Sequence, residues 1–160
     1  MVIPFHRQTT DYTCGPASLQ MVFEYFGKYI SQKKLEDLLK TSKDAGTNHE
    51  ALIGAATDNG FYCYVNNEST VHEIKHFLLM HLPVIIHYIE PSSQEGQYAV
   101  VSGLRSGKLV LNDPWNGKGF HLSERNFLKR WHDSKNVHKN WIMTVSKEDF
   151  NIGKQFLPKE

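Results

Sequence analysis

QTTDYTCGPASLQMVFEYFG, residues 8–27, is the stretch that decides how the rest of the chain is interpreted. Its second half predicts an amphipathic helix that ends at Gly27, because apolar residues recur at the spacing i, i+3, i+4 and i+7. These residues are Leu19, Val22, Phe23 and Phe26. Cys14 lies in a polar context just before this helix. Free amides and partial positive charge at a helix N-terminus favour a thiolate, so we predict a reactive thiol at Cys14.

The residues next to Cys14 and the second cysteine refine this prediction. Gly15 would let a substrate backbone approach closely, and Pro16 suits an early helical position, where its missing N–H needs no partner. A buried structural cysteine is the alternative for Cys14. Cys63 alternates with aromatic residues in FYCYV and is predicted to be a core residue.

Three further helices are predicted before residue 83. One starts after Ser31, with Leu35, Leu38 and Leu39 facing inward. Two others open with a capping box, a Ser or Thr followed three residues later by Glu or Gln. The two boxes are Thr47–Glu50, in a helix that closes at Gly60, and Thr70–Glu73.

Beyond Pro83 the chain changes to β-branched runs separated by turn-forming residues. Strands are predicted at 61–65, 83–90, 97–104, 108–113 and 140–146, with a strand end and a short helix within 120–131. Helices followed by an antiparallel sheet predict an α+β fold. We expect a single domain over residues 1–160, with a site in the cleft between two lobes.

Composition excludes several classes of function. The chain has 160 residues, with 18 Lys and Arg against 17 Asp and Glu, so no net charge favours nucleic acid or an acidic membrane. The nine histidines are scattered along the chain and are interpreted as surface or hydrogen-bonded residues, so no metal site is expected. No apolar run reaches the roughly 18 residues of a membrane span, and no signal peptide is seen. A cytoplasmic location is expected, although a secreted chain trimmed of its leader would look the same.

The segment 8–27 resembles the signature of C39 and C39-like peptidases, a family of papain-like cysteine peptidases. LPVIIHY followed by YAVVSGL is similar to the central strands of that family, and LVLNDPWNG is similar to its aspartate loop. The resemblance covers nearly the whole chain. It implies a papain-like, two-lobed fold with an N-terminal helical lobe and a C-terminal antiparallel sheet. It also implies that Cys14 is the nucleophile.

The resemblance assigns roles to three more residues. Gln8 stands six residues before Cys14, where the family has a glutamine that helps form the oxyanion hole. Asp113 matches the aspartate that orients the catalytic histidine, although a turn in Asn-Asp-Pro would need the same residue. The histidine itself is expected at the start of the YAVV strand, where this chain has Gln97. A glutamine cannot take up a proton near neutral pH and so cannot act as a general base.

Three nearby residues have less specific assignments. His87 lies on the preceding strand, and a hairpin could bring it to the same face as Gln97, as a substitute base. The alternative for His87 is a packed strand histidine. Tyr98 and Trp115 could line the cleft and grip an extended peptide, although packing under a loop explains Trp115 equally well.

Three functions are compatible with the sequence. The first is a thiol peptidase that acts through an acyl-enzyme on Cys14, impaired by Gln97. Resemblance implies leader peptides ending in Gly-Gly as substrates, although that specificity belongs to transporter-fused members of the family. The second is a pseudopeptidase that binds peptides without turnover, and the third is a cysteine acyltransferase or amidase on the same fold. All three imply a peptide or protein partner and no cofactor, and the sequence does not indicate an oligomeric state.

Overall fold

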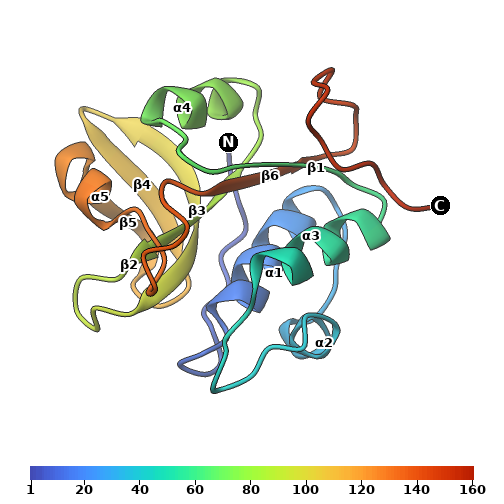
Figure 1. Cartoon of the computed structure of the whole chain (residues 1–160), viewed down its shortest axis with the longest axis horizontal. Coiled ribbons are helices and arrows are strands. Elements are labelled where there is room, and N and C mark those ends of the chain that lie inside the picture. Colours follow the sequence, from blue (N-terminus) through green and yellow to red (C-terminus); the bar gives the residue numbers. More distant parts are fainter.

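The computed structural model describes all residues, 1–160. Helices and strands follow one another along the chain as drawn in Figure 1. Their bounds are α1 Cys14–Tyr25, α2 Gln32–Leu38, α3 His49–Asp58, β1 Tyr62–Asn66, α4 Val71–Leu79, β2 Val84–Ile89, β3 Gly96–Arg105, β4 Lys108–Asp113, β5 Gly117–Ser123, α5 Glu124–Arg130 and β6 Ile142–Ser146.

The strands form one six-stranded sheet in the order β1-β6-β2-β3-β4-β5, with every pairing antiparallel. The prediction of helices combined with an antiparallel sheet is therefore confirmed. Helices α1, α2 and α3 lie on one side of the sheet, and α4 and α5 lie on the other (Figure 1). No helix is both long and apolar enough to cross a bilayer.

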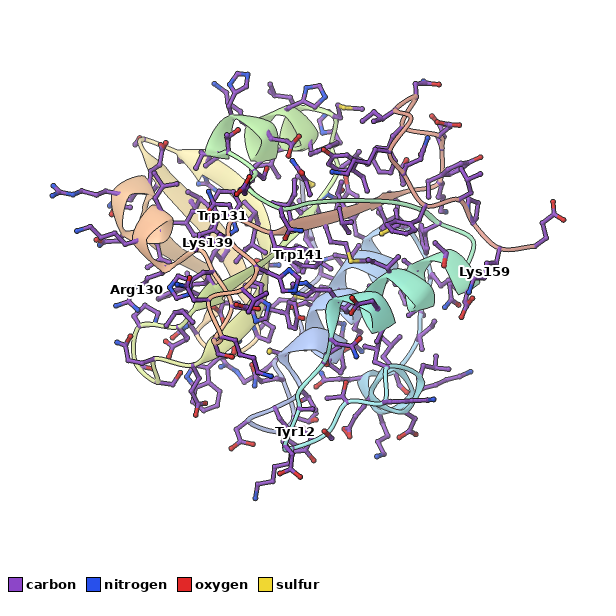
Figure 2. All side chains as sticks on the ribbon, in the orientation of Figure 1. Tyr12, Arg130, Trp131, Lys139, Trp141 and Lys159 are labelled. Carbon is purple, nitrogen blue, oxygen red and sulfur yellow. The ribbon has the colours of Figure 1, made fainter.

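Alternation along the strands gives each face of the sheet its own core. In β3, Tyr98 and Val100 face the cluster that contains α1 and α3, whereas Ala99 and Val101 face the cluster that contains α4 and α5. Successive strand residues point to opposite faces, so both faces of β3 can be buried only if apolar residues occupy consecutive positions. Figure 2 labels one tryptophan from each core, Trp141 on the α3 side and Trp131 next to α5.

The N-terminal segment 1–13 contains no helix or strand and is hydrogen-bonded to the end of β4 and the residue that follows it. Asn112 donates its side-chain amide to the carbonyl of Ile3 at 3.1 Å, and the Gln8 N–H donates to the carbonyl of Pro114 at 3.1 Å. These bonds bring Gln8 alongside the loop that follows Asp113, although the two residues are far apart in the sequence.

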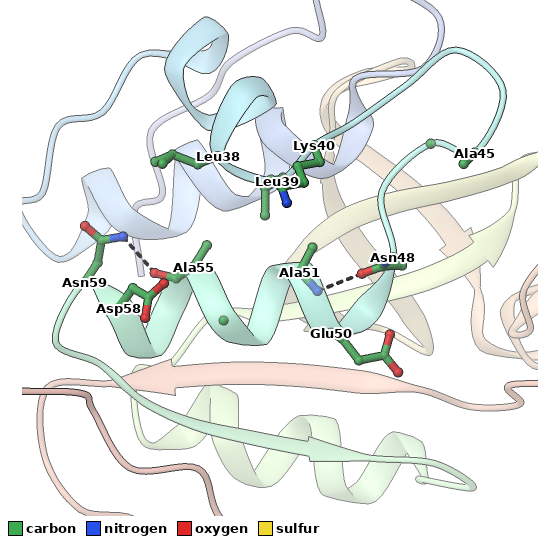
Figure 3. Close-up of a pocket in the computed structure, with 12 residues that line it drawn as sticks. Leu38, Leu39, Lys40, Ala45, Asn48, Glu50, Ala51, Ala55, Asp58 and Asn59 are labelled. Carbon is green, nitrogen blue, oxygen red and sulfur yellow. Dashed lines mark hydrogen bonds between the residues drawn. The ribbon is translucent and has the colours of Figure 1, made fainter.

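Two details of the predicted helices are wrong. Leu38, predicted to face inward, is 52% exposed at the end of α2, whereas Leu35 and the C-cap residue Leu39 are buried. The cap of α3 is Asn48, whose side chain accepts from the Ala51 N–H at 2.7 Å (Figure 3). Asparagine caps helices as well as threonine does, so the helix starts one residue later than the capping box suggests.

The other helical signals agree with the structure. Ser31 caps α2, and Thr70 caps α4 by accepting from the Glu73 N–H at 3.0 Å. Gly27 has a φ of 85°, a left-handed conformation that glycine adopts readily, and it follows the end of α1. Helix α1 therefore starts at Cys14 and has the extent that its sequence predicts.

Candidate active site

Cys14 is the first residue of α1, and its side chain is held against β3. It is 9% exposed, and its Sγ accepts a hydrogen bond from the backbone N–H of Tyr98 at 3.4 Å. The Tyr98 hydroxyl donates to the carbonyl of Thr47 at 2.8 Å, which ties the loop before α3 to the same strand. The start of α1 is therefore packed between β3 and the loop that contains Thr47.

A cleft of about 450 Å³ opens at this point. Cys14, Thr47, His87 and Tyr98 form its inner lining, and charged residues line it further out. These charged residues are Asp11, Lys43, Asp44 and Glu95. Cys14 is among the lining residues although it is only 9% exposed, so little of this residue reaches the cleft.

The prediction of a thiolate at Cys14 is wrong for neutral pH. Burial raises the pKa of Cys14 to about 11; the Tyr98 N–H opposes that rise, and the charge of Asp113 adds to it. The amides at the helix N-terminus also act against the rise, but burial outweighs them. Burial likewise raises the pKa of Cys63 to about 12, and Cys63 is a fully buried core residue as predicted.

Gln8, Gln97 and Asp113 form a continuous hydrogen-bonded group, which we call the amide chain. Gln97 Nε2 donates to Asp113 Oδ1 at 3.1 Å and to Gln8 Oε1 at 2.9 Å. All three side chains are buried, and Asp113 is completely so. The structure thus brings together three predicted residues: Gln8 from the N-terminal segment, Gln97 from β3 and Asp113 from β4. The strand β3 is also the one whose Tyr98 N–H contacts Cys14.

Asp113 also accepts from groups outside the amide chain. The N–H groups of Trp115 and Asn116 donate to Oδ1 at 2.8 and 3.1 Å, and the hydroxyl of Tyr88 donates to Oδ2. Burial and the charge of Asp113 both raise the pKa of Tyr88, so its hydroxyl stays a donor. Asp113 therefore organises the turn after β4, as an aspartate in Asn-Asp-Pro does, and also holds Gln97.

His87 does not share a face with Gln97, so that prediction is wrong. In the β2–β3 hairpin His87 pairs with Tyr98, and Tyr88 pairs with Gln97. Directly opposed residues point to the same face and neighbouring residues point to opposite faces, so a one-residue difference in register reverses the placement. The ring of His87 stacks on that of Tyr98 with centroids 4.2 Å apart.

His87 belongs to a group of aromatic rings behind the cleft. Its Nδ1 lies 3.0 Å from His49 Nε2, and His49 stacks on Trp141 with centroids 3.9 Å apart. Burial lowers the pKa of His49 to about 4 and that of His87 to about 3, and the neighbouring His49 also lowers the pKa of His87. Both rings are therefore neutral at pH 7, and neither makes a hydrogen bond to Cys14.

Gly15 and Trp115 have positions that differ from those expected. The space next to the Gly15 Cα is filled by Thr47, because a Cβ added there would lie 2.6 Å from Thr47 Oγ1. The structure gives Gly15 a role in packing α1 against this loop. Trp115 is 44% exposed in the β4–β5 turn and lies outside the cleft lining, with its carbonyl accepting from Arg7 at 2.7 Å.

Three residues of this region were missed from the sequence: Thr47, Tyr88 and His49. Each acts through a contact across the fold, with Tyr98, Asp113 and His87 respectively. Only the strand register could have indicated Tyr88, as the partner of Gln97. No three side chains among the His, Cys, Asp and Glu residues are grouped so as to hold a metal ion.

Comparison with known proteins identifies the family of this chain. The family model described as "Peptidase C39 family" matches residues 2–137, which contain Cys14 and the whole amide chain. The chain belongs to the peptidase C39 family. Among C39 relatives, it is 30% identical over 132 residues to the transport/processing ATP-binding protein ComA of Streptococcus pneumoniae. That match covers 79% of the chain but 17% of ComA, so the chain spans a small part of this relative.

Solved C39 structures have the same fold. The peptidase domain of Streptococcus ComA, a bifunctional ABC transporter of a quorum-sensing pathway, is 25% identical, with a TM-score of 0.73. The match covers 92% of this chain and all of that domain. A double-glycine-motif protease of an AMS/PCAT transporter, solved with its leader peptide, is 21% identical with a TM-score of 0.72, over 90% of this chain and 91% of that one.

Proposed function

We propose that this chain is a C39 domain, on the papain-like two-lobed fold, that binds peptides in the cleft at Cys14 and hydrolyses them slowly or not at all. One observation carries the proposal. Gln97 Nε2 donates to both Asp113 and Gln8, so an amide takes the place at Asp113 that the imidazole of a Cys-His-Asp site would take.

Thiol hydrolysis of a peptide needs two proton transfers. The nucleophile must lose its proton, and the amine leaving group must gain one. An amide does neither near neutral pH, and the pKa of Cys14, about 11, keeps the thiol protonated. Loss of a general acid–base group costs roughly 10²- to 10⁴-fold in rate. These two features together support a binding domain with impaired turnover.

The proposed ligand is an extended peptide segment. Support comes from the double-glycine-motif protease, whose structure contains a leader peptide and has the fold of this chain. The cleft here offers the buried ring of Tyr98 and an exposed edge of Cys14 at its inner end. The charged residues at its outer part provide hydrogen-bonding groups for a peptide backbone.

The test combines a binding assay with a cleavage assay on a fluorogenic peptide that ends its leader part in Gly-Gly. Wild type should bind the peptide in anisotropy measurements and leave it uncleaved. Gln97→His should raise turnover on the order of 10²-fold or more, because Asp113 would orient the new imidazole next to the thiol. The gain should vanish in a Gln97→His, Cys14→Ala double variant.

Gln94→His is the matched control, because Gln94 is an exposed glutamine that lines the same cleft and makes no contact with Asp113. An imidazole there should give no turnover. Rapid cleavage by wild type that is lost in His87→Ala would refute the proposal and identify a displaced histidine as the base.

A further inference from the structure

The hydrogen bonds of Asp113 have a fixed direction. All of its partners are donors: the N–H groups of Trp115 and Asn116, the Tyr88 hydroxyl and the amides of Asn116 and Gln97. A carboxylate is only an acceptor, so Gln97 must turn its nitrogen, not its oxygen, toward Asp113. The orientation of the Gln97 amide is therefore imposed by this one buried charge.

The same logic continues to Gln8. The second N–H of Gln97 is directed at Gln8, so Gln8 must present its oxygen to Gln97, and it does so at 2.9 Å. The nitrogen of Gln8 then lies on the other side of its amide group, where it donates to the carbonyl of Thr10 at 2.8 Å. A reversed Gln8 amide would place two donors against each other.

The carbonyl of Thr10 locates the Gln8 nitrogen relative to Cys14. That carbonyl also accepts from the hydroxyl of Thr13, the residue immediately before Cys14. The Gln8 nitrogen therefore lies beside the turn that leads into α1. An amide nitrogen has two N–H groups, and the second one on Gln8 has no partner in the protein.

We propose that Gln97 is a positioning residue, which uses the charge of Asp113 to fix the Gln8 amide with a free N–H available to a peptide carbonyl bound at Cys14. This inference rests on the proposed function, because it concerns the peptide that the proposed function places at Cys14. Gln97 then does more than replace a catalytic base. It keeps the Gln8 amide able to bind the carbonyl oxygen of a peptide, in a site that has no group for proton transfer. Without it, the Gln8 amide is free to turn its oxygen toward the cleft.

A peptide aldehyde is the probe for this role. The Cys14 sulfur forms a bond to the aldehyde carbon, the C=O π bond breaks, and the thiol proton ends on the former carbonyl oxygen, giving a hemithioacetal. A donor at that oxygen stabilises the adduct, and removing such a donor from an enzyme commonly costs about 10²-fold or more. We expect Gln8→Ala and Gln97→Leu each to weaken the adduct at least tenfold. Gln155→Leu is the unaffected control, because Gln155 lies in the C-terminal segment and is not part of the cleft lining.

The double variant Gln8→Ala, Gln97→Leu decides between positioning and an independent role. If Gln97 acts only through Gln8, the double variant binds the aldehyde no more weakly than Gln8→Ala alone. Losses that multiply would overturn the proposal, because Gln97 would then be acting by another route.

A second measurement does not depend on the aldehyde. The side-chain amide signals of Gln8 in ¹⁵N NMR spectra, assigned by their loss in Gln8→Ala, should shift in Gln97→Leu. They should also shift in the nearly isosteric Asp113→Asn, which lets the Gln97 amide reverse. Unchanged Gln8 signals in both folded variants would overturn the positioning role. Failure of wild type to bind the aldehyde or any peptide, with these shifts present, would refute the proposed function alone.

Discussion

Replacing Gln97 with histidine should lower the pKa of Cys14, and the structure sets the size of the effect. In wild type, burial raises this pKa from its ordinary 9.0 to about 11. The ionised fraction of the thiol at pH 7 is therefore about 10⁻⁴. The amide nitrogen of Gln97 lies 3.1 Å from Asp113 Oδ1, so an imidazole in its place has a carboxylate available to orient it.

A protonated imidazole next to the sulfur favours the thiolate, as in other Cys-His pairs. If this pairing only cancels the effect of burial, the pKa of Cys14 returns to 9.0. The thiolate fraction at pH 7 then rises about 100-fold, and each further unit of lowering adds about tenfold. The rate of alkylation should increase by the same factor, because the thiolate is the reactive form.

The assay is iodoacetamide labelling between pH 6 and pH 10, followed by mass spectrometry of the two cysteine peptides. Wild-type Cys14 should react slowly, with a rate that climbs about tenfold per pH unit over the whole range. In Gln97→His the rate should be high at neutral pH and level off. Cys63 serves as the internal reference, because its pKa of about 12 and its full burial keep it unlabelled in both proteins.

Superimposable pH profiles for wild type and Gln97→His would refute this reasoning. They would mean that position 97 is not coupled to the sulfur, although the backbone N–H of the next residue contacts it. Faster labelling of Cys63 than of Cys14 would contradict the assigned burial of both thiols.

Two further predictions concern stability. Burial lowers the pKa of His49 to about 4 and that of His87 to about 3. Below about pH 6.5 the unfolded chain therefore binds protons at these two residues that the folded chain does not bind. Stability should be complete above about pH 6.5 and should fall by about 3 kcal/mol per histidine as the pH drops toward 4, because pH 4 lies about 2.5 units below the ordinary histidine pKa. Urea titrations should show a smaller fall in His49→Gln. Gly15→Ala should cost ~1–3 kcal/mol in calorimetry, because its Cβ would meet Thr47 Oγ1 at 2.6 Å. Its control, Gly54→Ala in α3, has no atom within 4 Å and should stabilise the protein by about 0.5–1 kcal/mol; equal effects of the two changes would contradict the packing assignment.

The candidate site could be located from the sequence to a useful degree. The polar segment before the apolar helical stripe placed Cys14 at the start of α1, and the turn signal at Asp113 placed it at the end of β4. These predictions succeed because they depend on local rules, namely the start of a helix and the chemistry of a turn. The grouping of Gln97 with Asp113 was predicted only through resemblance, and the hydrogen bond from Gln97 to Gln8 was not predicted.

The predictions that failed required information about distant segments. The ionisation of Cys14 depends on how much water surrounds the sulfur, and this is set by β3 and the loop at Thr47 packing over the helix end. A local rule for helix termini gives the opposite sign. The face on which His87 lies depends on the hairpin register, and a shift of one residue reverses it.

The sequence by itself determined the order of helices and strands, the position of Cys14 at a helix start and the absence of a histidine at residue 97. Tertiary structure alone decided the protonation of the thiol and the direction of the hydrogen bonds from Asp113 through Gln97 to Gln8. The physical reason is that helix and strand formation depends mainly on neighbouring residues, whereas desolvation and the pairing of buried donors with acceptors depend on which distant groups exclude water from the same place.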